Sequence, residues 1–242
     1  MAGALAIQSV VVAFGGLRAL DGISARFETN EITGLIGPNG SGKSTLVNTI
    51  SGQITPSGGS IGFGDTDITG LRADRIVKLG LARTYQIPRM PPQLTVAEVL
   101  AVPLAYGGRT HLLDGLDKPA PIAEFCGLGK LLNRRCGALS VTDLRRLEIA
   151  RALACGPTML LLDEVMAGLS HADSVDVMAV VQRVHAAGIG VVIIEHIMRV
   201  ITTLCHRVVV LNNGDLLVAG TPADVLADPA VREAYLGKGY KQ

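Results

Sequence analysis

The chain has 242 residues, enough for one large domain or for one domain with an inserted lobe. Its net charge of +1 gives no electrostatic case for binding nucleic acid or an anionic membrane surface. Its four cysteines lack the spacing of a metal site, and no stretch reaches the ~20 apolar residues that span a bilayer, so any membrane contact is expected to be peripheral.

The predicted elements begin with a strand over the apolar residues 1–14, which lack the basic start of a signal peptide. Short apolar runs predict buried strands at 31–37, 158–164 and 189–196. An Asn-Gly pair between two apolar runs predicts a β-hairpin over 207–220. Because these strands alternate with helical patterns, the expected fold class is α/β with a mostly parallel sheet.

The middle of the chain has a different pattern, with prolines at its start and an irregular loop expected at 105–121. This region is the candidate inserted helical subdomain. Near the end of the chain, Thr221 and the Asp228-Pro229 pair predict two helix starts. The expected organisation is one domain over 1–242, with a core from 1–87 and 155–242 and a helical subdomain at 88–154.

The stretch GPNGSGKST follows a predicted strand and opens a predicted helix, and it matches the phosphate-binding pattern G-x-x-x-x-G-K-[ST]. Glycines let such a loop curl until its N–H groups face phosphate oxygens, and the helix N-terminus adds positive potential. We therefore expect a bound nucleotide, with Lys43 on its β- and γ-phosphates and Ser44 on Mg²⁺. The expected contacts are Gly37, Pro38, Asn39, Gly40, Ser41, Gly42, Lys43, Ser44 and Thr45.

Two acidic residues end the apolar run LLLDE. At the end of a strand, Asp163 is suited to hold the coordination shell of Mg²⁺. Glu164 beside it is suited to accept a proton from an attacking water molecule. Together with the phosphate loop, these acids predict hydrolysis of the bound nucleotide, with Mg²⁺ as a cofactor.

Over nearly its whole length the chain resembles the nucleotide-binding domain of ATP-binding-cassette (ABC) transporters. The resemblance implies a P-loop, RecA-like core with an antiparallel β-subdomain and an inserted helical subdomain. Gln86 in ARTYQIPRM matches the family's glutamine that senses Mg²⁺ and contacts the transmembrane partner, so it joins Ser44 and Asp163 as a candidate metal ligand. His196 in IIEHIM matches the switch histidine, and Phe14 lies where an aromatic side chain stacks on adenine.

Several stretches narrow the resemblance to the ATPases of bacterial importers for branched-chain amino acids and amides or urea: ARTYQIPRMPPQLTVAEVL, RRLEIARAL, IIEHIMRVI and AYLG. Lipopolysaccharide-export ATPases are close relatives, so a lipid or polysaccharide exporter is an alternative. The implied partners are a second ABC subunit, in a homo- or heterodimer, transmembrane permease subunits and, indirectly, a periplasmic or extracellular substrate-binding protein. No nucleic acid is expected. The implied place is the cytoplasmic face of the bacterial plasma membrane, as a peripheral subunit.

The helix start LSVTDLRR departs from the family's pattern. In the family this start points across a dimer interface at the γ-phosphate on the other subunit, and small residues let the phosphate approach. Ser140 is present, but Thr142 takes the glycine position and Asp143 brings a negative charge. At ~6 Å and a dielectric of ~20, that charge would cost about 3 kcal/mol, unless Asp143 turns back to its own helix cap. Ser140 and Asp143 also form a capping-box pattern, which predicts a helix.

The combined interpretation is an ATPase with Glu164 as the base and a weakened composite site. A second alternative, of another class, is a non-hydrolysing ATP-binding clamp whose partner supplies the working helix start. Milder departures follow Glu164, at Val165, Met166 and Ser170. Hydrolysis is still favoured because six residues with expected chemical roles are all present: Lys43, Ser44, Gln86, Asp163, Glu164 and His196.

Overall fold

The structure is a computed structural model that describes residues 3–86, 90–106 and 115–236. Its contacts divide the chain into two compact units, residues 1–76 with 192–242, and residues 77–191. Part of the irregular loop predicted at 105–121 lies outside the described residues. Within the described ranges, no helix combines the length and the apolar character needed to cross a membrane.

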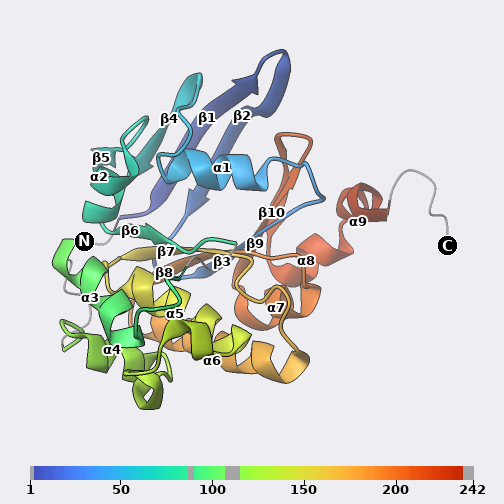
Figure 1. Cartoon of the computed structure of the whole chain (residues 1–242). Helices are drawn as coiled ribbons and strands as arrows, with labels where there is room; N and C mark the ends of the chain where they lie inside the picture. Colours follow the sequence, from blue (N-terminus) through green and yellow to red (C-terminus); the bar gives the residue numbers. More distant parts are fainter. Residues whose placement is uncertain (1–2, 87–89, 107–114, 237–242) are drawn as a thin grey trace. The chain divides into compact units, whose positions relative to one another are not determined.

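The first unit contains an antiparallel sheet with the strand order β2-β1-β4-β5 (Figure 1). Every second residue at the start of β1 is buried, and a register shift near Ser9, whose φ is 48°, moves the buried face by one residue. The antiparallel subdomain and its first strand are therefore confirmed. The strands are β1 (Leu5–Phe14), β2 (Leu17–Phe27), β4 (Gly58–Phe63) and β5 (Thr66–Asp67).

In the first unit, β9 (Arg207–Asn212) pairs with a strand on each side. The fully buried β3 (Ile32–Ile36) runs parallel to β9, which forms an antiparallel hairpin with β10 (Asp215–Gly220). Asn213 and Gly214 both have positive φ, 49° and 83°, as a two-residue hairpin turn requires. The strands predicted at 31–37 and 207–220 are thus confirmed.

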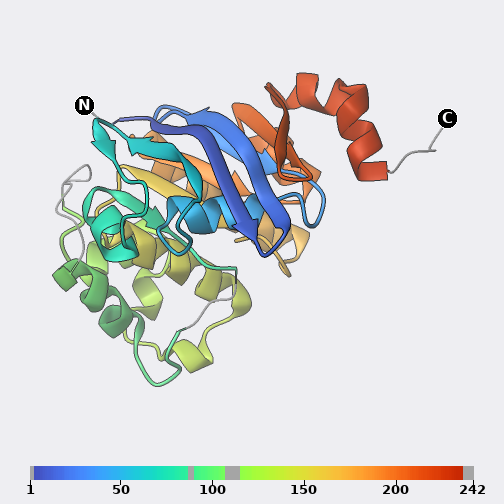
Figure 2. The same ribbon diagram turned by 90° about the horizontal axis from the view of Figure 1, so that it is seen from above.

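Among the described residues, the helices that lie wholly in the first unit are α1 (Lys43–Ile50), α7 (Met198–Leu204), α8 (Pro222–Ala227) and α9 (Pro229–Leu236). Thr221 caps α8 by accepting the N–H of Asp224, and Asp228 accepts the N–H of Ala230 at 2.7 Å at the start of α9. Both predicted helix starts are confirmed. Figure 2 shows α8 and α9 beside the hairpin of β9 and β10, which they contact.

The second unit contains the parallel strands β6 (Leu81–Arg83) and β7 (Met159–Asp163) and a group of helices. In this group α3 and α4 pack on each other and on α5, which also contacts α6, β6 and β7 (Figure 1). The predicted helical subdomain is therefore present, while its boundaries at 88 and 154 stay a prediction. The helices are α3 (Val96–Tyr106), α4 (Pro119–Phe125), α5 (Val141–Leu153) and α6 (His171–Ala186), with short 3₁₀ turns η1 (Gly129–Leu131) and η2 (Cys136–Ala138).

Two elements cross the division between the units along the chain. They are α2 (Ala73–Lys78) and β8 (Gly190–Ile194). All five residues of β8 are buried, as expected for the predicted apolar strand at 189–196.

Candidate functional site

The phosphate loop of the first unit curls between β3 and α1. Ser41 is buried, and its N–H donates to the carbonyl of Pro38 at 3.2 Å, which closes a turn. The carbonyl of Ser41 accepts the N–H of Gly214 at 3.1 Å, so the hairpin of β9 and β10 supports the loop from one side. The sequence therefore folds into the loop that its glycine pattern predicts.

Two glycines of this loop allow close packing that no other residue would permit. A Cβ on Gly37 would lie 2.1 Å from the carbonyl oxygen of Leu211. A Cβ on Gly42 would lie 2.8 Å from the carbonyl oxygen of Ala19, and Gly42 has a φ of 103°. The glycines thus allow the loop to pack closely against neighbouring backbone, in addition to letting it curve.

Lys43 is the first residue of α1 and turns back over the loop. Its Nζ donates to the carbonyls of Gly37 at 2.7 Å and Pro38 at 2.9 Å, and lies 3.4 Å from Ser41 Oγ. No side chain caps α1 at Gly42, which is typical of a helix start that receives an anion. Among the other predicted contacts, Asn39, Gly40 and Ser44 are exposed and Thr45 is half-buried.

A contact that the sequence analysis missed joins α9 to this loop. The side chain of Tyr235 forms a hydrogen bond with the backbone of Gly37, and its partial burial raises the pKa of the phenol. No sequence pattern relates a tyrosine near the end of the chain to a loop near its beginning. Tyr235 is thus an additional residue at the phosphate loop.

Phe14 and His196 lie in the first unit together with the loop. Phe14 ends β1 and is 52% exposed, which is high for an aromatic side chain. His196 follows β8 and is exposed. Both side chains are accessible to a ligand, and their roles stay predictions.

The second unit brings together Gln86, Asp163 and Glu164. The buried carboxylate of Asp163 accepts a hydrogen bond from Arg83 at 2.7 Å, in an ion pair that the sequence analysis missed. Glu164 leaves the strand in the left-handed region, with a φ of 49°. Its carboxylate accepts a hydrogen bond from Gln86 Nε2 at 2.6 Å. Two acids and an amide thus gather at the end of β7.

The predicted helix start at Ser140 also belongs to the second unit. Ser140 Oγ accepts the N–H of Asp143 at 3.1 Å and donates to the Asp143 carboxylate at 2.7 Å. The same carboxylate lies 3.7 Å from Arg146 Nη1. The predicted cap is confirmed. Because Asp143 turns back to its own helix, its charge is partly compensated.

Side chains near the start of α5 connect this helix to α6, and one of them is Thr142, which takes the glycine position of the family. Thr142 is buried and hydrogen-bonds to the carboxylate of Asp173, which also accepts a hydrogen bond from Ser170, the cap of α6. Both contacts, that of Ser170 first, lower the pKa of Asp173. Arg146 Nη2 lies 2.6 Å from the carboxylate of Asp176 on α6. Two polar contacts therefore join the first two turns of α5 to the first two turns of α6.

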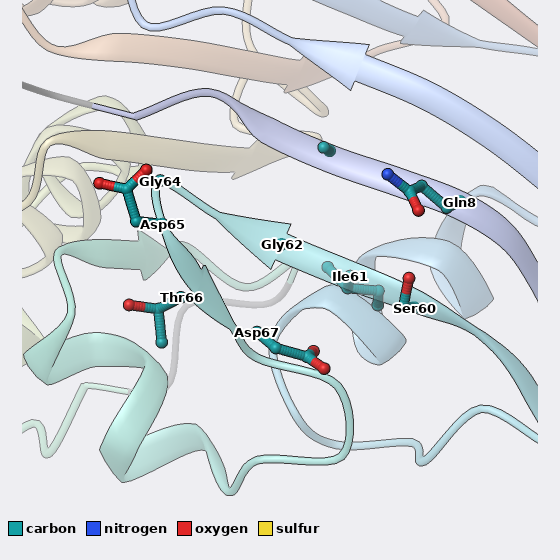
Figure 3. Close-up of a pocket in the computed structure, with 9 residues that line it drawn as sticks. Gln8, Ser60, Ile61, Gly62, Gly64, Asp65, Thr66 and Asp67 are labelled. Atoms are coloured by element: carbon teal, nitrogen blue, oxygen red, sulfur yellow. The ribbon is translucent and has the colours of Figure 1, made fainter.

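A pocket of about 300 Å³ lies on the antiparallel sheet of the first unit (Figure 3). Gln8 and Ser60 line it from neighbouring strands, and Thr66 and Asp67 line it from β5. Hydrogen bonds from Thr69 lower the pKa of Asp67. None of the predicted nucleotide contacts is among the residues that line this pocket.

A family model described as ABC transporter matches residues 20–167, which is more than half of the chain. The chain belongs to the ABC transporter family. A second model, described as branched-chain amino acid ATP-binding cassette transporter, matches residues 216–241 of this ABC protein.

Similar proteins of known type narrow the assignment of this subunit within the ABC transporter family. It is 33% identical to the high-affinity branched-chain amino acid transport ATP-binding protein BraF of Pseudomonas aeruginosa, over 97% of this chain and 98% of the relative. It is also 33% identical to the corresponding protein LivG of Escherichia coli K12, with the same coverage. The subunit is therefore an ABC transporter ATPase of the branched-chain amino acid type.

A solved structure supports the same conclusion. The ADP conformation of an ATP-binding cassette of an ABC transporter matches the ABC subunit with a TM-score of 0.89 and 33% sequence identity. The match covers 98% of this chain and 100% of that chain. The predicted fold class, a mostly parallel core with an antiparallel β-subdomain and helices, is confirmed. Membership of an ATP-binding-cassette family implies nucleotide binding.

The changed helix start of the ABC subunit gives a first prediction. Replacing Thr142 by Gly and Asp143 by Gln should raise ATP turnover by no more than about tenfold, because Ser140 and Arg146 already compensate the removed charge. The helix start should lose about 1 kcal/mol of stability with its cap. Turnover and denaturant unfolding of the full chain measure both effects.

The matched control for this pair is Asp224→Gln, which removes the same cap chemistry at Thr221. It should lower stability without changing turnover. A hundredfold rise in the double variant would mean that the Asp143 charge acts uncompensated. No rise at all would make the stretch a tolerated cap with no effect on hydrolysis.

Burial of an acid in α5 gives a second prediction. Desolvation raises the pKa of Glu148 from 4.5 to about 7, although Arg145 and Arg151 act in the opposite direction. Between those values the folded chain holds the proton more tightly than the unfolded chain, so the free energy of unfolding falls as pH rises through this window. In Glu148→Gln, the free energy of unfolding should not show the decrease that the titration of Glu148 causes. Urea unfolding of both proteins between about pH 5 and 8 tests it, and a constant difference between the two would contradict the raised pKa.

Proposed function

We propose that this ABC subunit hydrolyses ATP to power the import of branched-chain amino acids or related small amides. The observation that carries the proposal is the similarity to branched-chain amino acid transport ATP-binding proteins over 97% of the chain. The complete phosphate loop and the hydrogen bond between Gln86 and Glu164 support it.

In the proposed mechanism, each unit supplies its own chemistry. In the first unit, Lys43 and the loop amides bind the phosphates and stabilise the transferred charge. Phe14 stacks on the adenine, and His196 holds the γ-phosphate and the attacking water. In the second unit, Glu164 orients that water and accepts its proton. Ser140 contributes to the γ-phosphate contact of a second subunit.

The residues proposed for Mg²⁺ match the ion's chemistry. Mg²⁺ prefers oxygen ligands and usually keeps several waters, and a hydroxyl, an amide and a carboxylate supply such oxygens. We assign these to Ser44, Gln86 and Asp163. When bound, the ion would neutralise charge on the phosphates. Arg83, which pairs with Asp163, would hold that carboxylate in place.

The proposed partners follow from the family. A second ABC subunit pairs with this one, ATP closes the pair and hydrolysis reopens it. Permease subunits at the cytoplasmic face of the plasma membrane receive this motion, and a substrate-binding protein delivers the cargo on the other side. The subunit itself then acts as a peripheral protein.

Reconstitution tests this proposal. The subunit, its partner ABC subunit, their permeases and the binding protein are placed in lipid vesicles, and uptake of labelled leucine is measured with and without ATP. We expect ATP-dependent uptake that is lost with Glu164→Gln in this subunit. ATP turnover without leucine uptake, stimulated instead by a lipid or polysaccharide, would favour the export alternative.

One observation favours a second candidate, an ATP-binding clamp. The hydroxyl of Ser140 donates a hydrogen bond to the carboxylate of Asp143, so its proton is already engaged within the helix cap. A clamp would bind ATP through the phosphate loop but leave hydrolysis to a site that its partner completes. Turnover of the isolated full chain distinguishes the two candidates, because only the enzyme releases phosphate on its own.

A further inference from the structure

Two charged side chains are buried on one face of α5. Arg145 is 6% exposed and Glu148 is 1% exposed. Their ion pair is long, with 3.4 Å between Arg145 Nη1 and Glu148 Oε2. Burying charged groups is unfavourable unless further hydrogen bonds satisfy them. Apolar residues at such positions would often give equal or greater stability of the fold. The remaining partners of the pair therefore indicate what the charges do.

Arg145 reaches two loops that carry candidate catalytic residues. Its Nη1 donates to the carbonyl of Gln86 at 2.9 Å, and its Nη2 donates to the carbonyl of Ala167 at 3.1 Å. The planar guanidinium holds both donors in a fixed geometry, which a lysine ammonium does not. One side chain thus joins α5 to the segment that follows β6 and to the turn that follows Glu164.

Glu148 adds a second contact to the same segment. The backbone of Tyr85, the residue before Gln86, lowers the pKa of the Glu148 carboxylate by hydrogen bonding, while Glu148 Oε1 is buried without a hydrogen-bond partner among the described residues. Arg145 and Glu148 are three residues apart and share one helix face. They therefore hold two consecutive backbone groups, and the side chain of Gln86 extends from this held backbone to the carboxylate of Glu164 at 2.6 Å.

We propose that Arg145, supported by Glu148, is a positioning residue for hydrolysis. It fixes the backbone of Gln86 and the turn after Glu164 to α5, so that the carboxylate of Glu164 is aimed correctly when this helix is in place. The inference rests on the proposed role of Glu164 as the base. Arg145 acts through Gln86 and Ala167 and not on the nucleotide.

The test compares turnover with nucleotide affinity in the full chain. Arg145→Met removes the hydrogen bonds and keeps much of the side-chain bulk, and Arg145→Lys keeps the charge. At saturating ATP, turnover should fall about 10- to 100-fold in the Met variant and less in the Lys variant. Affinity for a fluorescent, non-hydrolysable ATP analogue should stay within about threefold of the parent, because the phosphate loop is built from other contacts. Arg183→Met, at an exposed arginine of α6, is the matched control and should keep parental turnover.

A double-mutant cycle separates positioning from general loss of structure. Gln86→Ala should lower turnover, and the double variant should lose less than the product of the two single effects, because both changes break the link between α5 and Gln86. Effects that multiply in the double variant, or parental turnover in Arg145→Met, would overturn the inference. Assays are run below the unfolding transition of each variant. If Glu164→Gln turns over like the parent, the proposed base is wrong. If Glu164→Gln loses turnover and Arg145→Met does not, only the positioning role is wrong.

Discussion

Replacing Glu164 by glutamine should lower steady-state ATP turnover by about 10²- to 10⁴-fold while nucleotide binding persists. This is the range that a positioned general base contributes. The amide keeps the shape of the side chain but accepts a proton poorly. In the structure Glu164 follows β7 with a φ of 49°, and its carboxylate accepts a hydrogen bond from Gln86. The backbone conformation and the contact with Gln86 together set the direction of this carboxylate. The variant should also accumulate a nucleotide-bound dimer, since the step that reopens the pair is blocked.

Phosphate release and size-exclusion chromatography with ATP measure the two effects. The control is Glu28→Gln, at a half-buried glutamate paired with Arg26 in the other unit, which should turn over like the parent. Turnover of Glu164→Gln within a factor of two of the parent would remove Glu164 as the base. The alternative would then be a water held by His196 alone.

Replacing Lys43 by alanine should weaken ATP binding by about 10- to 100-fold, the effect of losing a hydrogen-bonding charge of about 1.5–3 kcal/mol. Two losses combine in this variant. The ammonium no longer reaches the phosphates, and the carbonyls of Gly37 and Pro38 lose the donor that holds them in the structure. Titration with a fluorescent ATP analogue measures the change.

Lys130→Ala, at an exposed lysine in η1, is the control and should bind like the parent. Thermal unfolding without nucleotide adds a second readout, because the phosphate loop loses internal hydrogen bonds in Lys43→Ala. Unchanged affinity would mean that the backbone of the loop binds phosphate without this lysine.

Much of the fold could be predicted because short, local sequence patterns indicate the strands and the turn. The buried runs at β3, β7 and β8 have no polar interruption, and the Asn-Gly turn of the β9–β10 hairpin needs positive φ at two adjacent residues. The strand β2 was not predicted, because Gly22 and several charged residues break its alternation on a half-exposed sheet. The shift at Ser9 likewise breaks the period-two pattern of β1.

The candidate site also contains residues that could be predicted from the sequence and residues that could not. The phosphate loop and the acids at the end of β7 are contiguous in the sequence, so their residues could be named from it. Arg83 and Arg145 could not, because their partners lie 80 and 59 residues away in the sequence. A buried arginine in a helix looks like any surface arginine until its carbonyl partners are known. Tyr235 has the same difficulty, since its partner is Gly37.

The changed start of α5 also has an entropic consequence. Glycines have more conformational freedom than other residues, and that freedom is lost when they become ordered. With Thr142 and Asp143 in place, the first turn of α5 is already restrained by Ser140 and by Asp173 of α6. Ordering of this turn therefore accompanies folding, and a partner that docks there meets a stiff surface with little entropy left to lose. A glycine-rich start would instead become ordered upon docking.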